Sequence, residues 1–198
     1  MDDNFLVQQT LQGNKNAFRF LVLRYQKPIF KILGTLIFDA SQVEEIAQDT
    51  FLRAYKSLAT FDPSRGVSFS TWLFTIARNL AFNALEKRKV RQTHHHVLEE
   101  QQEDLQELQQ HFDGSDRSDP GEELDRRRKN GAVREAIEKL PADFRLAVVL
   151  SCLEGHSIAE IAQIEGCSEG TVKSRIFRGK QLLRQFLIPV LGATGDKS

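Results

Sequence analysis

The sequence contains few of the residues and runs that mark disulfide-rich, secreted or membrane proteins. Its 198 residues include two cysteines, Cys152 and Cys167, both at apolar-patterned positions that predict core packing rather than a disulfide framework. The longest apolar run, residues 32–38, is interrupted by Gly34 and Thr35 and is far shorter than a membrane span. The N-terminus lacks the basic region and apolar stretch of a secretory signal. We therefore expect a cytoplasmic protein without membrane insertion.

Signals of enzymatic chemistry are also missing. The sequence has no glycine-rich loop for phosphates and no set of residues at metal-ligand spacing. The histidine run at residues 94–96 has no partnered ligands, which favours a solvated tract over a metal site. Cys152, Glu154 and His156 are close in sequence, but their helical phase favours turn and core roles over catalysis. We expect no enzyme, no catalytic residue, no cofactor and no metal.

Charge is divided into three blocks, although the net charge is zero. Residues 1–98 contain 13 Lys and Arg against 8 Asp and Glu, and residues 126–198 contain the same numbers. Residues 99–125 contain one arginine and 11 acidic residues. Local fields on this scale outweigh the total charge, so the two basic blocks are candidates for binding nucleic acid.

The acidic block divides the chain into two domains. It carries too few apolar residues to fold alone, which predicts a linker. The flanking segments show helical periodicity, and neither contains a convincing series of strands or an internal repeat. We predict an all-α protein in which two small helical domains, residues 1–93 and 130–198, are joined by a flexible acidic linker at residues 94–129.

The C-terminal domain carries a helix-turn-helix pattern. Ser157 and Glu160 form a capping box that predicts a helix beginning at residue 158. Gly166 stands where the chain must turn, and we expect a positive φ there. Ser168 predicts the cap of a second helix, with Val172 as its core contact.

The outward face of this second helix is polar and cationic. It carries Lys173, Ser174, Arg175, Arg178 and Lys180. Such side chains can reach phosphates and base edges in a major groove. An ordinary helical hairpin with a solvated basic face is the alternative, but the agreement of caps, turn glycine and core spacing favours DNA binding.

Three further helical features are expected in the N-terminal domain. Pro28 and Gly34 predict an interruption or kink of the first long helix. Ser41 and Glu44 form a second capping box that opens an amphipathic helix. A loop at residues 61–68 then leads into a helix with a continuous apolar stripe.

Together these blocks resemble regions 2 and 4 of the bacterial extracytoplasmic function (ECF) sigma factors, group 4 of the sigma-70 family. The resemblance rests on residues 43–58, 69–89 and 140–180, in this order. It implies a promoter-specificity subunit of RNA polymerase that directs transcription initiation by recognising the −35 duplex and the melted −10 strand. A stand-alone helix-turn-helix repressor or activator is the alternative, but the resemblance to region 2 argues against it.

The resemblance also implies the binding residues. Those implied at the −35 element are Thr171, Lys173, Ser174, Arg175 and Arg178. Those implied at the −10 element are Phe61, Arg78, Asn79, Asn83, Lys87 and Arg88. Those implied to contact core polymerase are Glu45, Gln48 and Asp49.

Within the −10 set, Asn79 corresponds to the family's flipped-base pocket and Phe61 lies in its specificity loop. Amides can bond base edges and aromatic rings can stack on bases. Trp72 could act as a wedge for melting DNA, but its place in the apolar stripe favours a core role.

The partners implied by the resemblance are core RNA polymerase, through its β′ clamp helices and β flap, promoter DNA and an anti-sigma factor. The polar face at residues 45–49 could instead be simply solvated. The acidic linker either mimics nucleic acid inside the polymerase or serves as a solubilising spacer, and the sequence favours neither interpretation.

Overall fold

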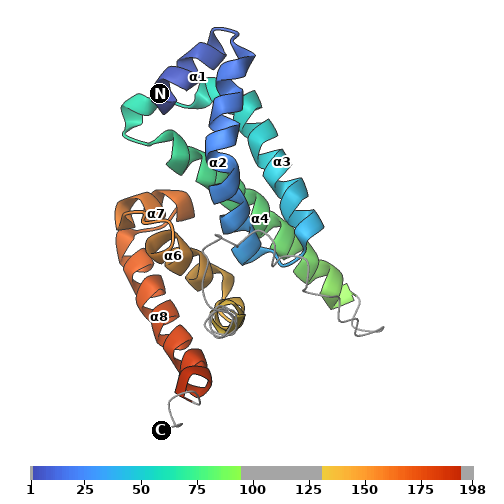
Figure 1. The fold of residues 1–198 in the computed structure, drawn as a ribbon, viewed down its shortest axis with the longest axis vertical. Helices are drawn as coiled ribbons and strands as arrows, with labels where there is room; N and C mark the ends of the chain where they lie inside the picture. The colour runs from blue at the N-terminus through green and yellow to red at the C-terminus, as the bar shows by residue number, and fades with distance from the viewer. Residues whose placement is uncertain (1, 95–130, 193–198) are drawn as a thin grey trace, which may run out of the picture.

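The structure is a computed structural model that describes residues 2–94 and 131–192. The N-terminal helices are α1 (Asp3–Leu11), α2 (Lys15–Leu36), α3 (Ala40–Ser57) and α4 (Phe69–His94), with short 3₁₀ turns η1 (Leu58–Thr60) and η2 (Pro63–Arg65) between α3 and α4. The C-terminal helices are α6 (Ala142–Cys152), α7 (Ile158–Glu165) and α8 (Glu169–Gly192), preceded by helical residues 131–138. The described parts of the chain hold helices and turns but no strand, which confirms the all-α prediction (Figure 1).

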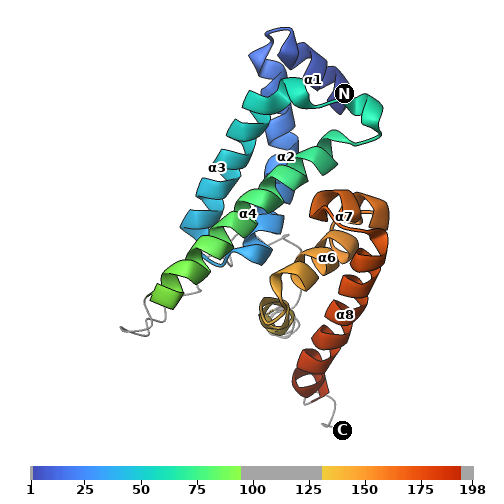
Figure 2. The same ribbon diagram turned by 180° about the vertical axis from the view of Figure 1, so that it is seen from behind.

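Helices α2, α3 and α4 pack side by side and form the N-terminal body, with α1 covering one end (Figures 1 and 2). The core is mostly aliphatic, with Leu33, Leu73 and Ala77 fully buried, and it includes the buried aromatic rings of Phe69 and Phe74. Each large apolar side chain buried in this way stabilises the fold by about 1.5–3 kcal/mol. Burial of one stripe on every helix therefore holds the body together.

Two local expectations for this body need correction. Helix α2 runs without interruption through Pro28, since the buried residues that follow, Ile29 and Ile32, keep the helix packed despite the missing amide hydrogen. Helix α3 is capped by Asp39, whose carboxylate accepts a hydrogen bond from the Gln42 amide (3.0 Å), and the helix begins before Ser41. Aspartate and serine are both good N-cap residues. Asp39 is the cap here because the extended segment after α2 ends at that residue.

The C-terminal body contains α6, α7, α8 and the helical residues 131–138, and in it α8 packs along α6 while α7 packs across one end (Figures 1 and 2). A Cβ at Gly179 would lie 2.7 Å from Cγ2 of Val148 and 3.3 Å from the carbonyl oxygen of Phe144. The absence of a side chain at this position is what allows α8 to approach α6 so closely.

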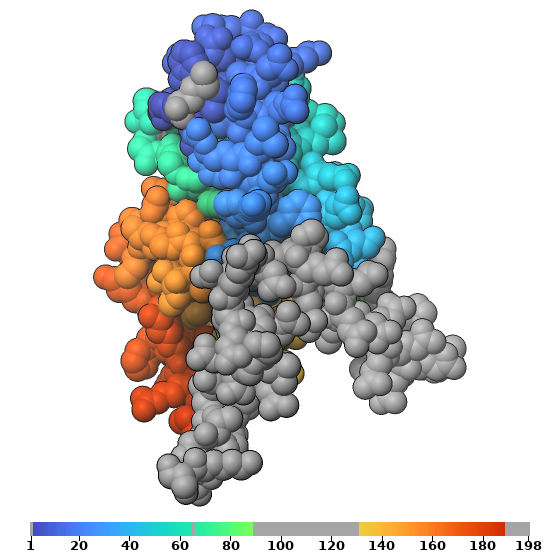
Figure 3. All heavy atoms as spheres, in the orientation of Figure 1, coloured from blue at the N-terminus to red at the C-terminus, as the bar shows by residue number. Residues whose placement is uncertain are grey.

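The two bodies lie against each other. Helix α7 packs on α4 and α6 packs on α2. The space-filling view shows the C-terminal body in contact with the N-terminal body (Figure 3).

Candidate nucleic-acid interface

The predicted cap and turn of the helix-turn-helix are both present. The Ser157 hydroxyl accepts a hydrogen bond from the Glu160 amide (3.2 Å), and the Glu160 carboxylate accepts one from the Ser157 amide (2.8 Å). The Glu160 carboxylate also accepts a hydrogen bond from the Ser157 hydroxyl (2.8 Å), and the two bonds that it accepts from Ser157 lower the pKa of the Glu160 carboxyl, the backbone bond having the largest effect. Gly166 ends α7 at φ +64°, as the turn requires.

The cap and outer face of α8 follow the sequence prediction with one exception. Ser168 accepts a hydrogen bond from the Thr171 amide (3.2 Å), and the Val172 side chain is fully buried under the helix. The side chains of the predicted DNA-contacting set that stand exposed on this helix are Thr171, Lys173, Ser174 and Arg178.

The exception is Arg175, which points into the C-terminal body. Its guanidinium hydrogen-bonds Glu165 of α7 and Asp143 of α6, the latter at 3.2 Å. The Glu165 side chain is 0 % exposed and that of Arg175 is 20 % exposed. Arg175 therefore ties all three helices together, and its donors face protein rather than DNA.

Electrostatics around this network reflect its burial. Burial raises the pKa of the Glu165 carboxyl, and Arg175 opposes the rise. Burial lowers the pKa of the Arg175 guanidinium, but the neighbouring Glu165 and Asp143 carboxylates outweigh this effect and raise it. The Cys167 thiol lies beside both partners, and burial followed by the Glu165 charge raises its pKa.

Phe177 is a candidate contact that the sequence analysis missed. Its side chain is 69 % exposed on α8, between Ser174 and Arg178 on the same face. The sequence could have shown this contact, because Phe177 lies three residues after Ser174 and that spacing places both side chains on one side of a helix.

Asn79 lies in a pocket between α3 and α4. The pocket has a volume of about 430 Å³, and its lining residues are Arg53, Lys56, Ser57, Ile76, Asn79 and Leu80. Arg53 and Lys56 belong to the polar face of α3 and were not predicted for the −10 site. An amide, two cations and an apolar floor therefore meet at one opening.

Phe61 is placed differently from the other candidates for the −10 element. Its side chain is 7 % exposed and packs against Phe69 and Trp72, with ring centroids 5.7 and 5.4 Å away. In this structure the Phe61 ring supports the loop from inside and presents no face for stacking. Trp72 packs on the same aromatic cluster, as its place in the apolar stripe predicts.

The remaining −10 candidates lie along α4. Asn83, Lys87 and Arg88 are exposed. Arg78 is partly buried, since its guanidinium lies over the Phe82 ring (4.5 Å) and donates a hydrogen bond to the Asn79 side-chain oxygen (3.0 Å). The orientation of the Asn79 amide is thus coupled to Arg78.

The predicted polymerase-binding side chains share one exposed face of α3. Glu45, Gln48 and Asp49 all point to solvent. Leu52, which is 50 % exposed, continues this face by one further turn and was not predicted.

The residues considered as candidates for catalysis or metal binding lie in surroundings that do not favour those roles. Cys152 is exposed, so its predicted core role is wrong, since the residue lies at the end of α6 where the helix leaves the core. Glu154 and His156 contact the N-terminal body instead of each other. The histidine run at residues 94–96 lies outside the described side chains. Within residues 2–94 and 131–192, the acidic, histidine and cysteine side chains form no group of three or more suited to a metal ion.

Comparison with known proteins decides between the alternatives. Residues 21–91 match the Sigma-70 region 2 family, and residues 130–183 match the Sigma-70 region 4 family. The RNA polymerase sigma-H factor of Pseudomonas aeruginosa is 36% identical over 194 residues, which cover 96% of this chain and 95% of that protein. The chain belongs to the ECF class of the sigma-70 family. It is a promoter-recognition subunit of RNA polymerase, and the region 2 match excludes a stand-alone helix-turn-helix regulator.

Other relatives match the sequence or fold of this ECF sigma factor over nearly their whole length. The ECF RNA polymerase sigma-E factor of Haemophilus influenzae is 34% identical over 192 residues, covering 96% of this chain and 98% of the relative. The structure of CnrH in complex with the cytosolic domain of CnrY matches with a TM-score of 0.64 and 28% identity, over 93% of this chain and 96% of that one. The sigma factor RpoE of Bartonella quintana, solved with the anti-sigma factor NepR, matches in fold with a TM-score of 0.64 and 24% identity, over 91% and 98% of the two chains.

Membrane insertion was not expected, and none of the helices in the described ranges is both long and apolar enough to span a bilayer.

Proposed function

We propose that this sigma factor reads the −35 duplex with α8 and captures the melted −10 strand at the pocket between α3 and α4. The observation that carries the proposal is the convergence of Asn79, Arg53 and Lys56 on one open pocket with an apolar floor. An amide can bond the edge of an unpaired base, and the two cations can hold its phosphates.

Replacing Asn79 with alanine should impair open-complex formation much more than binding to the −35 duplex. The amide supplies hydrogen bonds to a base that is unpaired only after melting, at roughly 1–3 kcal/mol for a good pair of bonds. Permanganate footprinting of the melted strand measures the first step, and a gel-shift assay with −35 duplex measures the second. Asn4→Ala, an exposed change on α1, is the control. Equal behaviour of the two variants would contradict the base pocket.

At the −35 element, the exposed part of α8 supports a division of roles. Arg178 can bind guanine bidentately, while Lys173 and Ser174 hold phosphates or base edges. The exposed Phe177 ring fits apolar contact with a thymine methyl group. Arg175 supports this surface from behind.

The α3 face with Glu45, Gln48 and Asp49 is the proposed docking surface for the β′ clamp helices. Charge complementarity then governs association, because carboxylates on this face meet basic groups on the partner. The β flap is the proposed contact of the C-terminal body. We further propose that an anti-sigma factor regulates the chain, as the complexes of CnrH and RpoE suggest.

Replacing Asp49 with arginine should weaken binding to core polymerase by about tenfold or more, since the change reverses a charge within the docking face. Fluorescence anisotropy with labelled sigma factor and purified core enzyme measures the affinity. Glu135→Arg, an equal charge change at an exposed site of the C-terminal body, is the control. Unchanged affinity of Asp49→Arg would remove this face from the docking surface.

This sigma factor acts in the cytoplasm and works by binding, without bond-making chemistry of its own. Promoter melting then draws its free energy from contacts with polymerase and DNA. The direct test mixes the protein with sigma-free core polymerase and genomic DNA and maps transcript 5′ ends. We expect new starts that share a −35 and a −10 motif, while starts unchanged by the protein would contradict the proposed function.

A further inference from the structure

The pocket between α3 and α4 has a polar lining that consists mostly of hydrogen-bond donors. The polar residues that line it are Arg53, Lys56 and Ser57 of α3 and Asn79 of α4. Guanidinium and ammonium groups carry donors and no acceptor. The lining residues all lie in the described part of the chain, and none of them is a carboxylate. The hydrogen-bonding character of the pocket therefore depends on how the Asn79 amide and the Ser57 hydroxyl are oriented.

Arg78 decides the orientation of the Asn79 amide. Its Nη1 donates a hydrogen bond to Asn79 Oδ1 at 3.0 Å. Because a guanidinium has no acceptor, the amide must direct its oxygen, and not its NH₂ group, toward Arg78. The NH₂ group itself has no hydrogen-bond partner within residues 2–94 and 131–192. Asn79 therefore presents free N–H donors to a ligand in the pocket.

Arg78 is held in place by its own surroundings on α4. The guanidinium lies 4.5 Å from the centroid of the Phe82 ring, and a cation is attracted to an aromatic face. Its Nε is buried. Asn79 lines the pocket, whereas Arg78 is not one of the lining residues. Arg78 therefore acts on the contents of the pocket through Asn79.

The Ser57 hydroxyl supplies an acceptor. It donates its hydrogen to the carbonyl oxygen of Arg53, at 2.7 Å. A hydroxyl has one donor and two acceptor lone pairs, so a hydroxyl whose hydrogen is engaged can only accept further bonds. The lining side chains thus combine several donors with one accepting oxygen.

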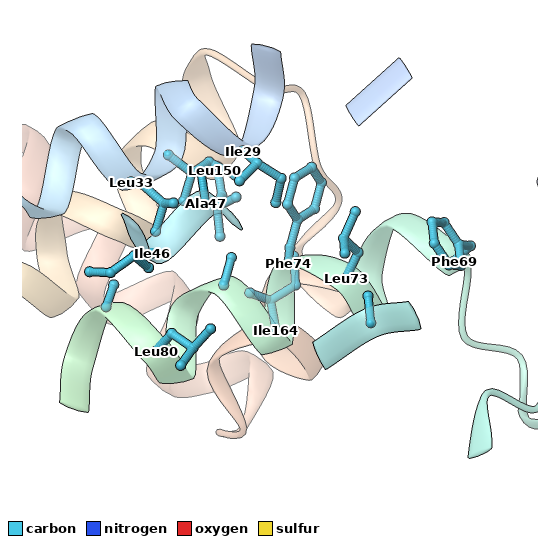
Figure 4. Packing of buried hydrophobic residues seen from close by; sticks show 14 of the residues in the cluster. Ile29, Leu33, Ile46, Ala47, Phe69, Leu73, Phe74, Leu80, Leu150 and Ile164 are labelled. Atoms are coloured by element: carbon cyan, nitrogen blue, oxygen red, sulfur yellow. The ribbon is translucent and has the colours of Figure 1, made fainter. Parts of the chain in front are cut away.

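The floor of the pocket is apolar. It is formed by Ile76 and Leu80 of α4. Leu80 is 9 % exposed and belongs to the buried apolar cluster shown in Figure 4. A methyl group on this floor is removed from water, whereas a polar group there would lose its hydration without a partner. The floor therefore favours a base that carries an apolar substituent.

The four DNA bases differ in how they match these groups. Adenine, cytosine and guanine each carry an exocyclic amine, a donor that would meet the donors of Asn79, Arg53 and Lys56. A buried donor without an acceptor carries the full cost of its desolvation. Thymine has carbonyl oxygens, a ring N–H and a methyl group, and no amine. Its carbonyl oxygens match the donors, its N–H matches the Ser57 oxygen, and its methyl group matches the floor.

We infer that Arg78 is a positioning residue that fixes the Asn79 amide and thereby makes the pocket select a flipped thymine. Arg78 keeps the NH₂ group of Asn79 toward the pocket and withholds the amide oxygen from the base. This assignment of the base rests on the proposed function, because it takes the pocket as the site that captures the melted −10 strand.

Selection of fork-junction DNA by the holoenzyme tests the choice of base. The DNA carries the −35 duplex of a promoter mapped from transcript 5′ ends, and its non-template overhang is randomised over the −10 element. Sequencing of the bound fraction should show one position at which thymine exceeds each other base by roughly tenfold. Asn79→Ala should abolish the preference at that position alone.

The outcomes separate the choice of base from the proposed function. An Asn79-dependent position that prefers another base would overturn the selection of thymine and leave the base pocket in place. If Asn79→Ala changed the preference at no position, the pocket would not be the base site, and both the proposed function at the −10 element and the selection of thymine would be overturned.

Substitutions at Arg78 test the positioning role. Arg78→Met keeps an unbranched side chain on the Phe82 ring but removes the donors, so the Asn79 amide can present either end. The preference for thymine should fall about tenfold, to near equality with cytosine. Arg78→Lys keeps a charged donor and should retain most of the preference. Arg88→Met removes an exposed cation from the same helix and should weaken binding of every sequence without changing the preference. An unchanged preference in Arg78→Met would overturn the positioning role.

Asn79→Asp reverses the character of the group that faces the pocket. One carboxylate oxygen keeps the bond to Arg78, and the other is an acceptor where the NH₂ group stood. The preferred base should change from thymine to cytosine, a pyrimidine that carries an amine in place of a carbonyl group. A misfolded protein would lose selectivity and would not acquire a new one. Asn4→Asp, the same change at an exposed site of α1, should keep the preference for thymine. Retention of thymine by Asn79→Asp would overturn the donor role of the amide.

Discussion

Replacing Arg175 with alanine is expected to destabilise the C-terminal body by about 3–5 kcal/mol, the usual cost of breaking a buried ion pair by removing one partner. The change leaves the fully buried Glu165 carboxylate without its cation. It also releases Asp143 and so loosens α6, α7 and α8 together. Thermal unfolding of the full chain, followed by circular dichroism, measures the loss.

A double variant distinguishes this role from a DNA contact. Glu165→Leu/Arg175→Leu should recover most of the stability, because replacing both members of a buried pair with apolar residues is often neutral or better. If Arg175→Ala kept wild-type stability and lost only −35 affinity, Arg175 would be a DNA contact after all. The ion-pair network would then carry little of the stability of the body.

Replacing Arg178 with alanine is expected to weaken −35 binding by about 1–3 kcal/mol if the side chain bonds a base bidentately. Arg178 is exposed on the capped helix, beside Phe177 and Ser174. Fluorescence anisotropy of the holoenzyme on promoter duplexes with single −35 substitutions measures the loss. The variant holoenzyme should lose its discrimination between bases at one position of the −35 element and keep it at the other positions.

The salt dependence of binding provides the contrast for Arg178. A phosphate contact would weaken binding to all duplexes equally and reduce the slope of log K against log salt by about one. Arg184→Ala, an exposed change further along α8, is the control and should leave specificity unchanged. A uniform loss for Arg178→Ala would contradict base reading and assign the residue to the backbone.

Local signals in the sequence were sufficient to predict the helix-turn-helix. The Ser157–Glu160 capping box and the Ser168 cap depend on contacts three residues apart, which the sequence shows directly. Glycine is the residue favoured where a helix ends in a sharp turn. The positive φ of Gly166 therefore followed from its place in the pattern. The helical class and the two-part organisation followed from periodicity and charge in the same way.

Contacts between distant segments decided the rest. Arg175 and Arg178 look alike in sequence, and only the buried Glu165 and Asp143 beside Arg175 turn one inward while the other stays exposed. The pocket at Asn79 likewise needs Arg53 from another helix. Periodicity reports which face of a helix is apolar, but the partner that a polar side chain meets depends on how helices far apart in the chain pack together.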